Sequence, residues 1–200
     1  MNKLENKVVL ITGAGKGSGR ALAEAFAEHG AIIAANDISP INVEEVVDGI
    51  VARGGKAKAY VEDIAKKVGV QAVVNSVEDD FGRIDILVNH AAVEPHGPLL
   101  KMDEWDWHRT LDVNLTGAFL MTQSVGRLMA GKGGGVILNL VTGATEGGVK
   151  EAGAYFTSKA GLAELSIQAD RELSPHGVRV FAVENSADVV KQILLLLEAK

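Results

Sequence analysis

The chain has 200 residues, of which 47% are hydrophobic, and this length suits one domain with a substantial buried core. Its 20 Lys and Arg residues against 26 Asp and Glu residues give a net charge of −6 without a basic run, so nothing in the composition favours nucleic acid as a partner. The sequence has no cysteine, which excludes disulfides and thiolate chemistry and is compatible with a reducing compartment.

The sequence contains no recognisable targeting signal and no cluster of metal ligands. The stretch Met1–Glu5 has no signal-peptide core, and no apolar run approaches the length of a membrane span. The five histidines are scattered without the spacing of metal ligands. We therefore expect a cytoplasmic protein with no membrane partner and no bound metal.

Apolar runs typical of strands alternate with helical patterns along the chain. The strand-like runs cover Val8–Thr12, Ala31–Asn36, Ala57–Val61, Ile84–Asn89, Gly135–Val141 and Val178–Val183. The helical patterns cover Gly19–His29, Val43–Arg53, Lys66–Phe81, Glu104–Met129 and Ala154–Leu173. This βαβ alternation predicts an α/β fold with a doubly wound parallel sheet between two helix layers, and ligands of such sheets bind at the carboxyl ends of the strands.

The first strand runs directly into a turn in which every second residue is glycine: Gly13, Gly15, Gly17 and Gly19. Glycine lets the backbone turn tightly and approach a pyrophosphate closely, and the helix that follows offers free N–H groups and a partial positive charge. The order of strand, glycine turn and helix predicts a dinucleotide phosphate site that also includes Lys16 and Ser18. The alternative is a plain βα turn.

The end of the second strand carries an acidic residue, Asp37. A carboxylate there can accept hydrogen bonds from both hydroxyls of an adenosine ribose, and it would repel a 2′-phosphate by roughly 4 kcal/mol at about 4 Å. Lys16 argues for a 2′-phosphate, but a solvated lysine contributes on the order of 1 kcal/mol or less. The sequence therefore favours NAD over NADP as cofactor.

Two further loops stand where cofactor-binding loops belong in such a sheet. Asp63 and Ile64 follow the third strand, and the stretch from Asn89 to Ala92, which includes Ala91, follows the fourth. Ordinary turn chemistry remains an alternative for both loops.

The pair Tyr155 and Lys159 lies four residues apart within a helical pattern, so the two side chains share a helix face. A tyrosine with an unperturbed pKa of about 10 is a weak acid–base group at neutral pH, but a nearby ammonium favours the phenolate and lowers that pKa. A surface Tyr/Lys pair without a catalytic role is the alternative.

Together these stretches resemble the classical short-chain dehydrogenase/reductase family over about Lys7 to Val183. The resemblance rests on several motifs in order: Thr12–Gly19, Asp63, Asn89–Ala92, Leu111–Asn114, the Tyr155/Lys159 pair and Glu172–Val180. It implies a Rossmann-type fold with strand order 3-2-1-4-5-6 and reversible hydride transfer between a nicotinamide cofactor and an alcohol or ketone. It also implies a homodimer or homotetramer built on the two long helices.

The resemblance assigns roles to four residues. Tyr155 would exchange a proton with the substrate oxygen, Lys159 would lower the pKa of Tyr155 and hold the nicotinamide ribose, and Asn114 would belong to a water-mediated proton relay. The family's serine, thirteen residues before the tyrosine, is replaced by Thr142, which keeps the hydroxyl but adds a methyl that restricts its rotamer. Thr145 is a weaker substitute for that serine.

The chain also departs from the family pattern. The family's Asn-Asn-Ala-Gly reads Asn89-His90-Ala91-Ala92 here, and we assign His90 no catalytic role. After Val183 the family places Pro-Gly and a substrate-covering segment, followed by a helix and a final strand. Here the stretch near 184–186 leads directly into a helix, so the cover and the final strand are missing from what we expect to be one domain over 1–200.

Two explanations fit the missing cover: it is absent from the protein, or the printed sequence joins segments from either side of a stretch that it does not contain. The helix that follows, Asp188 to Ala199, is capped in our prediction by Ser186 and is apolar on most of its surface. It needs a partner surface, which is either the sheet or another subunit.

The sequence therefore predicts an NAD-dependent oxidoreductase acting on a small-molecule alcohol or ketone, with Tyr155 as general acid/base. The alternative is a catalytically impaired NAD-binding protein that lacks the substrate cover.

Overall fold

A single parallel sheet of six strands forms the centre of the computed structural model, which describes residues 4–143 and 149–198. The strands are β1 (Val8–Thr12), β2 (Ile32–Asp37), β3 (Lys56–Val61), β4 (Ile86–Asn89), β5 (Gly135–Val141) and β6 (Val178–Glu184). Their order is β3-β2-β1-β4-β5-β6, with every neighbouring pair parallel, which confirms the predicted Rossmann-type topology. Thr145 lies outside the described residues.

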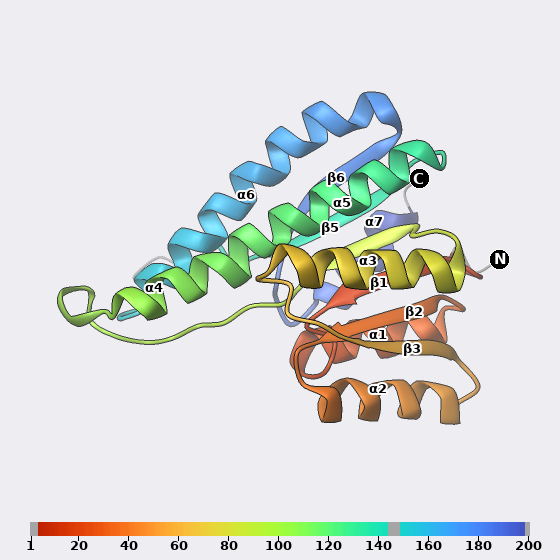
Figure 1. Ribbon diagram of the computed structural model, residues 1–200, viewed down its shortest axis with the longest axis horizontal. Helices are drawn as coiled ribbons and strands as arrows, with labels where there is room; N and C mark the ends of the chain where they lie inside the picture. Colours follow the sequence, from red (N-terminus) through yellow and green to blue (C-terminus); the bar gives the residue numbers. More distant parts are fainter. Residues whose placement is uncertain (1–3, 144–148, 199–200) are drawn as a thin grey trace.

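Helices cover both faces of the sheet in three layers (Figure 1). One face packs on α1 (Gly17–Glu28), α2 (Pro40–Ala52) and α7 (Val189–Glu198), and the other packs on α3 (Lys67–Phe81), α5 (Ala118–Gly131) and α6 (Gly153–Leu173). The central strand β1 is buried along its whole length, because its residues alternate between the two apolar clusters. The carboxyl ends of all six strands therefore lie at one edge, where ligands of such sheets bind.

The predicted helix Glu104–Met129 is divided into three pieces in the structure. These pieces are α4 (Glu104–Leu111), a π-helical turn η2 (Asp112–Gly117) and α5. A Cβ at Gly117 would lie 2.6 Å from Ile64 Cδ1, so the chain needs glycine where this turn passes the loop after β3. The apolar periodicity indicated a helix correctly but could not reveal the wider turn within it.

The last helix, α7, begins at Val189 rather than at Asp188. The backbone N–H of Val189 donates to the carbonyl oxygen of Ser186 (3.1 Å), and the Ser186 hydroxyl accepts a hydrogen bond from the side-chain amide of Gln192 (3.1 Å). Val189 and Ile193 are buried in the apolar cluster that contains α1 and α2. The sheet and α1 therefore supply the partner surface that the apolar sequence of this helix requires.

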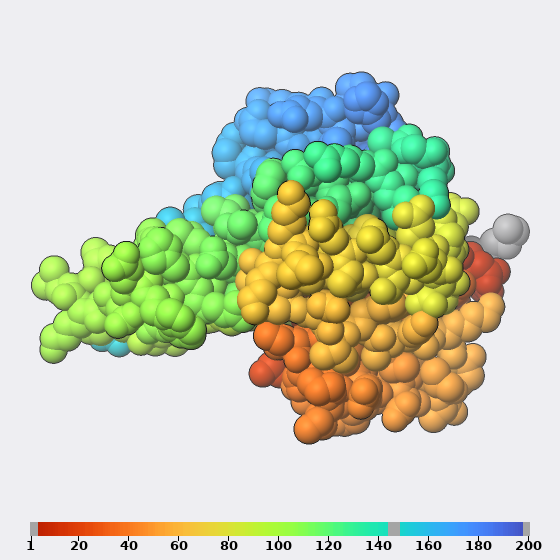
Figure 2. Space-filling view, viewed as in Figure 1, coloured from red at the N-terminus to blue at the C-terminus, as the bar shows by residue number. Residues whose placement is uncertain are grey.

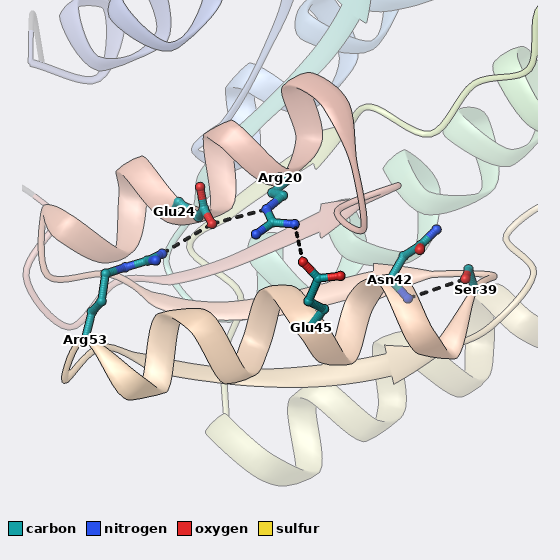
Figure 3. A network of polar contacts seen from close by, with 6 residues as sticks. All are labelled: Arg20, Glu24, Ser39, Asn42, Glu45 and Arg53. Carbon is teal, nitrogen blue, oxygen red and sulfur yellow. Dashed lines mark hydrogen bonds and ion pairs between the residues drawn. The ribbon is translucent and has the colours of Figure 1, made fainter.

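Ion pairs connect α1 to α2 on the surface (Figure 3). Arg20 contacts Glu45 at 2.8 Å and Glu24 at 3.2 Å, and Arg53 contacts Glu24 at 3.3 Å. The Ser39 hydroxyl accepts a hydrogen bond from a backbone N–H in the first turn of α2 (3.4 Å), as an N-cap does. Exposed pairs of this kind each contribute on the order of 1 kcal/mol or less, so they orient the helices more than they stabilise the fold.

The segment between β4 and α4 projects from the body of the molecule together with α4 (Figure 2). It contains a short 3₁₀ turn, Leu99–Lys101, and a second 3₁₀ turn, Ser174–His176, follows α6. Leu100 and Trp105 are 98% and 69% exposed on the projecting segment. The backbone N–H of Gly97 donates to the carbonyl oxygen of Glu151 (2.7 Å), which ties the segment to the start of α6. Within 4–143 and 149–198, no helix has both the length and the apolar composition needed to cross a bilayer.

Candidate active site

The glycine turn after β1 packs closely against the loop after β4 and against its own backbone. Gly13 has a φ of +68°, and a Cβ there would lie 2.7 Å from the Cα of Ala91. A Cβ at Gly19 would overlap the carbonyl oxygen of Gly13, so the first turn of α1 packs directly on the loop before it. Gly17 has a φ of +59° with open space where a Cβ would stand. A backbone that is bare at this position fits the approach of a pyrophosphate to the N–H groups of α1.

A cavity of about 240 Å³ opens beside this turn, at the carboxyl ends of β1 to β4. Six predicted cofactor residues line it: Gly13, Lys16, Asp37, Asp63, Ile64 and Ala91. Arg109 and Val113 close it from α4 and η2. The position, between the glycine turn and an acidic residue at the end of β2, fits the adenosine half of a dinucleotide.

Asp37 is held in place by the backbone around it. Its Oδ2 accepts a hydrogen bond from the N–H of Gly15 and its Oδ1 accepts one from the N–H of Ser39, each at 2.9 Å. A carboxylate that is already oriented by two donors loses little conformational entropy when it binds a ribose. The acidic residues that line the cavity are Asp37, Glu62 and Asp63, and its basic residues are Lys16 and Arg109.

The loop after β3 combines a turn and a buried side chain. Asp63 Oδ1 accepts a hydrogen bond from the N–H of Ala65 (3.1 Å), and its Oδ2 lies 3.6 Å from a guanidinium nitrogen of Arg109. Ile64 is buried and contacts the residues around Gly117. Asp63 therefore makes the turn contact that the sequence left as an alternative, and it also lines the cavity.

Asn89 lies apart from the cavity lining. Its side-chain amide donates to Asn139 Oδ1 (2.7 Å) and to Thr122 (3.2 Å), in the interior between β4, β5 and α5. Its Oδ1 is buried and has no hydrogen-bond partner among the described residues. The structure thus shows a polar contact that connects the central strands to α5.

The groups assigned to catalysis come together at the ends of β5 and α6. Thr142 Oγ1 lies 2.9 Å from the hydroxyl of Tyr155, one turn of α6 before Lys159. The ammonium of Lys159 donates to the carbonyl oxygen of Leu140 (2.8 Å) and lies 5.8 Å from the centre of the Tyr155 ring. Tyr155 and Lys159 thus share one helix face, as their spacing predicts.

Lys159 is a buried cation, with only 3% of its surface exposed. Burial lowers the pKa of its ammonium to about 8, and the charge of Glu94 counteracts part of this effect. Lys159 is therefore mostly protonated at neutral pH, but it loses its proton at a lower pH than an exposed lysine does.

Asn114 connects the π-helical turn to the loop after β4. Its Oδ1 accepts a hydrogen bond from the N–H of Val93 (2.8 Å), while its Nδ2 donates to the carbonyl oxygen of Val93 (2.9 Å) and to Ser158 Oγ (3.0 Å). Ser158 in turn donates to the carbonyl oxygen of Tyr155 (2.6 Å). Asn114 therefore positions the projecting segment against the helix that carries the Tyr155/Lys159 pair.

His90 and Ser158 are part of the site although the sequence suggested no role for them. His90 Nε2 lies 2.9 Å from Ser18 Oγ. Ser18 is one of the residues that the sequence places in the phosphate site. The departure from the family's Asn-Asn-Ala-Gly pattern was the available signal for His90. Ser158 had no local signal, because only the fold brings it to Asn114. Among the described residues, no three His, Asp or Glu side chains form a group that could hold a metal ion.

Comparisons with known proteins agree with this arrangement. A sequence model described as short chain dehydrogenase matches residues 7–187. A (2S)-[(R)-hydroxy(phenyl)methyl]succinyl-CoA dehydrogenase subunit from Thauera aromatica is 41% identical over 180 residues, which are 90% of this chain and 72% of the relative.

Solved structures with the same fold include proteins bound to either dinucleotide. A structure of NAD⁺-bound xylitol dehydrogenase has 33% identity and a TM-score of 0.86, with 99% of this chain and 78% of the other chain covered. A metagenomic short-chain oxidoreductase in complex with NADP has 30% identity and a TM-score of 0.91, covering 98% and 92%. Because the match extends over most of the chain in sequence and in structure, this protein belongs to the short-chain dehydrogenase family, whose members use NAD(P) to interconvert alcohols and carbonyl compounds.

Proposed function

We propose that this protein transfers a hydride between NAD(H) and a small-molecule alcohol or ketone, with Tyr155 as the general acid/base. The observation that carries the proposal is the 2.9 Å contact between the Tyr155 hydroxyl and Thr142 Oγ1, one helical turn from a buried ammonium. The cofactor supplies the hydride acceptor or donor when it is bound. The protein's own residues hold the substrate oxygen and move its proton.

In this mechanism each side chain has a separate task. Tyr155 takes the proton from an alcohol or returns it to a carbonyl oxygen, depending on direction. Thr142 donates a hydrogen bond to the same oxygen, and the charge of Lys159 stabilises the phenolate between turnovers. Asn114 keeps the loop after β4 in register with α6.

Replacing Tyr155 with Phe tests this assignment. We expect turnover to fall by at least about a hundredfold because proton transfer is lost, while the NADH Kd measured by fluorescence titration stays within about twofold. Thr142→Ala should lower kcat as well, and Thr142→Ser should restore most of it. Normal turnover in Tyr155→Phe would exclude the proposed role.

We further propose that NAD is preferred over NADP. The support is the carboxylate of Asp37, which two backbone N–H groups orient at the cavity, together with an excess of acidic over basic residues in the cavity lining. These charges would repel a 2′-phosphate. Asp37→Ala should improve NADP⁺ affinity relative to NAD⁺ by about tenfold or more, measured as the ratio of the two Kd values. An unchanged ratio would show that Asp37 does not select the cofactor.

A second candidate is an NAD(H)-binding protein with little catalysis. It is favoured by the short connection between β6 and α7, because only residues 185–188 separate the end of one from the start of the other. No covering segment therefore follows β6 among the described residues. This candidate predicts NAD(H) binding without turnover on a broad panel of alcohols, aldehydes and ketones.

We also propose that the protein self-associates through α5 and α6 as a homodimer or homotetramer. A groove of about 450 Å³ runs between these helices, and Phe119 at its margin is 40% exposed. A groove with an exposed aromatic side chain is typical of an interaction surface.

A further inference from the structure

His90 lies against the glycine turn, with its ring between the two ends of that turn. A Cβ at Gly13 would lie 3.0 Å from His90 Nδ1, and a Cβ at Gly19 would lie 2.6 Å from it. The other ring nitrogen, Nε2, is 2.9 Å from the hydroxyl of Ser18 in the first turn of α1. The backbone N–H of His90 donates to Thr12 Oγ1 (3.1 Å). The imidazole thus connects the end of β4 to both sides of the turn.

The second ring nitrogen of His90 is buried and has no hydrogen-bond partner in the described structure. The carbonyl groups of Thr12 and Gly13 nevertheless lie close enough to favour a proton on the ring, so a protonated His90 would have acceptors nearby. The charged groups that face the ring are Lys159 on α6 and Asp37 at the end of β2. The side of the ring toward α1 meets the uncharged Ser18, and the carbonyl groups of Thr12 and Gly13 lie on the β1 side.

We propose that His90 is a positioning residue for the pyrophosphate-binding turn, and that it takes up a proton when a dinucleotide binds, so that cofactor affinity rises as pH falls. In the free protein the N-terminus of α1 and Lys159 both oppose a charge on the ring. A pyrophosphate at the same helix terminus reverses that preference, because it places negative charge near the ring. Binding and protonation then favour each other by the same factor.

The environment of the free protein is consistent with this direction. Burial and the charge of Lys159 lower the pKa of His90, and the carbonyl groups of Thr12 and Gly13 and the carboxylate of Asp37 offset part of that decrease. His90 is therefore neutral at pH 7 without cofactor, and a proton can be added when an anion arrives. The inference depends on dinucleotide binding but not on turnover.

Calorimetric titration of NADH into the protein at pH 6.0, in two buffers that differ in ionisation enthalpy, measures the proton directly. We expect uptake of a fraction of a proton per site in the wild type. The Kd should tighten about three- to tenfold between pH 7.0 and pH 5.5, a range in which Lys159, with a pKa of about 8, stays mostly protonated. Wild-type binding without proton uptake would overturn the proposal, and so would the failure of both NADH and NADPH to bind.

Three variants separate titration from packing. His90→Gln and His90→Asn keep a neutral hydrogen-bonding side chain, so both should bind NADH with a Kd that no longer depends on pH between 7.0 and 5.5. Ser18→Ala should weaken binding at every pH but retain proton uptake, because His90 is still present. His29→Gln is the matched control, since His29 lies at the opposite end of the same helix and contacts the carbonyl oxygen of Ala25 (2.8 Å).

The variants also identify which claim fails. Proton uptake that persists in both His90 variants would assign it to another group, and unchanged affinity in Ser18→Ala would exclude the positioning role. Thermal unfolding of each variant shows whether it is folded, and the wild-type calorimetry decides the matter if His90 variants do not fold. If the Tyr155→Phe experiment excluded Tyr155 as the general acid/base, these results would still hold, because they depend on cofactor binding and not on turnover.

Discussion

Lys159 illustrates how a single residue combines charge and burial. The ammonium is nearly inaccessible, and the pKa of about 8 lies well below the usual value of 10.5 for lysine. We therefore expect Lys159 to be the group that limits activity in alkali. A surface lysine would keep its charge to a much higher pH.

We expect kcat/KM to fall as pH rises through about 8, because deprotonation of Lys159 removes the positive charge beside Tyr155. The sign follows from the lowered pKa, since the free enzyme loses this proton earlier than an exposed lysine would. A pH–rate profile of kcat/KM measures the effect. Glu94→Gln should shift the alkaline limb to lower pH, because Glu94 raises the pKa of Lys159, whereas the exposed Glu104→Gln should not.

For single residues, the sequence predicts the position of a side chain where its place along a helix or strand is sufficient to determine it. Tyr155 and Lys159 had to share a helix face, and Asp37 had to stand at the edge where ligands bind. The sequence could not show that Asn89 points into the interior toward Asn139, or that Ser18 contacts His90. Both depend on contacts between segments 50 or 72 residues apart, which a local pattern does not contain.

Among the elements, the π-helical turn η2 has the clearest effect on the site. Its Asn114 makes three hydrogen bonds that attach the backbone of Val93 and the side chain of Ser158 to one buried amide. A regular helix would place this residue at a different angle, because the wider turn changes the direction of the side chains that follow it. The loop after β4 is thereby fixed to η2 and α6 at once.

Asn114→Ala should lower the free energy of unfolding by about 1–3 kcal/mol, because it removes these hydrogen bonds and leaves backbone groups unpaired. Urea denaturation measures the loss, and hydrogen exchange should become faster in residues 93–98 than elsewhere. Glu44→Ala, at an exposed position on α2, is the control. Equal exchange in residues 93–98 of both variants would show that Asn114 does not hold the segment.

The ends of the strands were predictable where an apolar run gives way to glycine or to a polar residue. β1 and β5 have the predicted limits, because apolar runs end at a glycine turn or a polar residue. β4 begins two residues later than predicted, because the side chain of Asp85 is engaged with the chain before β1. It accepts a hydrogen bond from the N–H of Val8 (2.9 Å) and forms an ion pair with Lys7 (3.1 Å). The break within Glu104–Met129 was not predictable, because a single π-helical turn is short and the apolar residues on either side of it keep α-helical spacing.

For the molecule as a whole, the proposed self-association makes a direct prediction. The purified protein should have a mass in solution that is a multiple of 21.0 kDa by light scattering. Phe119→Glu should shift it toward the monomer, because it places a charge at the groove between α5 and α6. Ile41→Glu, at a 76% exposed position on α2, should leave the mass unchanged. A wild-type mass of 21.0 kDa at tens of micromolar protein would contradict the proposal.

The packing of α7 on α1 bears on how the protein is made in the cell. Leu22 and Phe26 of α1 share an apolar cluster with Val189 and Ile193 of α7. Although α1 is the first helix to leave the ribosome, its apolar face is therefore fully covered only after α7 has been synthesised. At roughly 5–20 residues per second, the 163 residues from Phe26 to Val189 take about 8–33 s to translate. During that interval the cofactor-binding half of the nascent chain exposes an apolar surface that chaperones can bind.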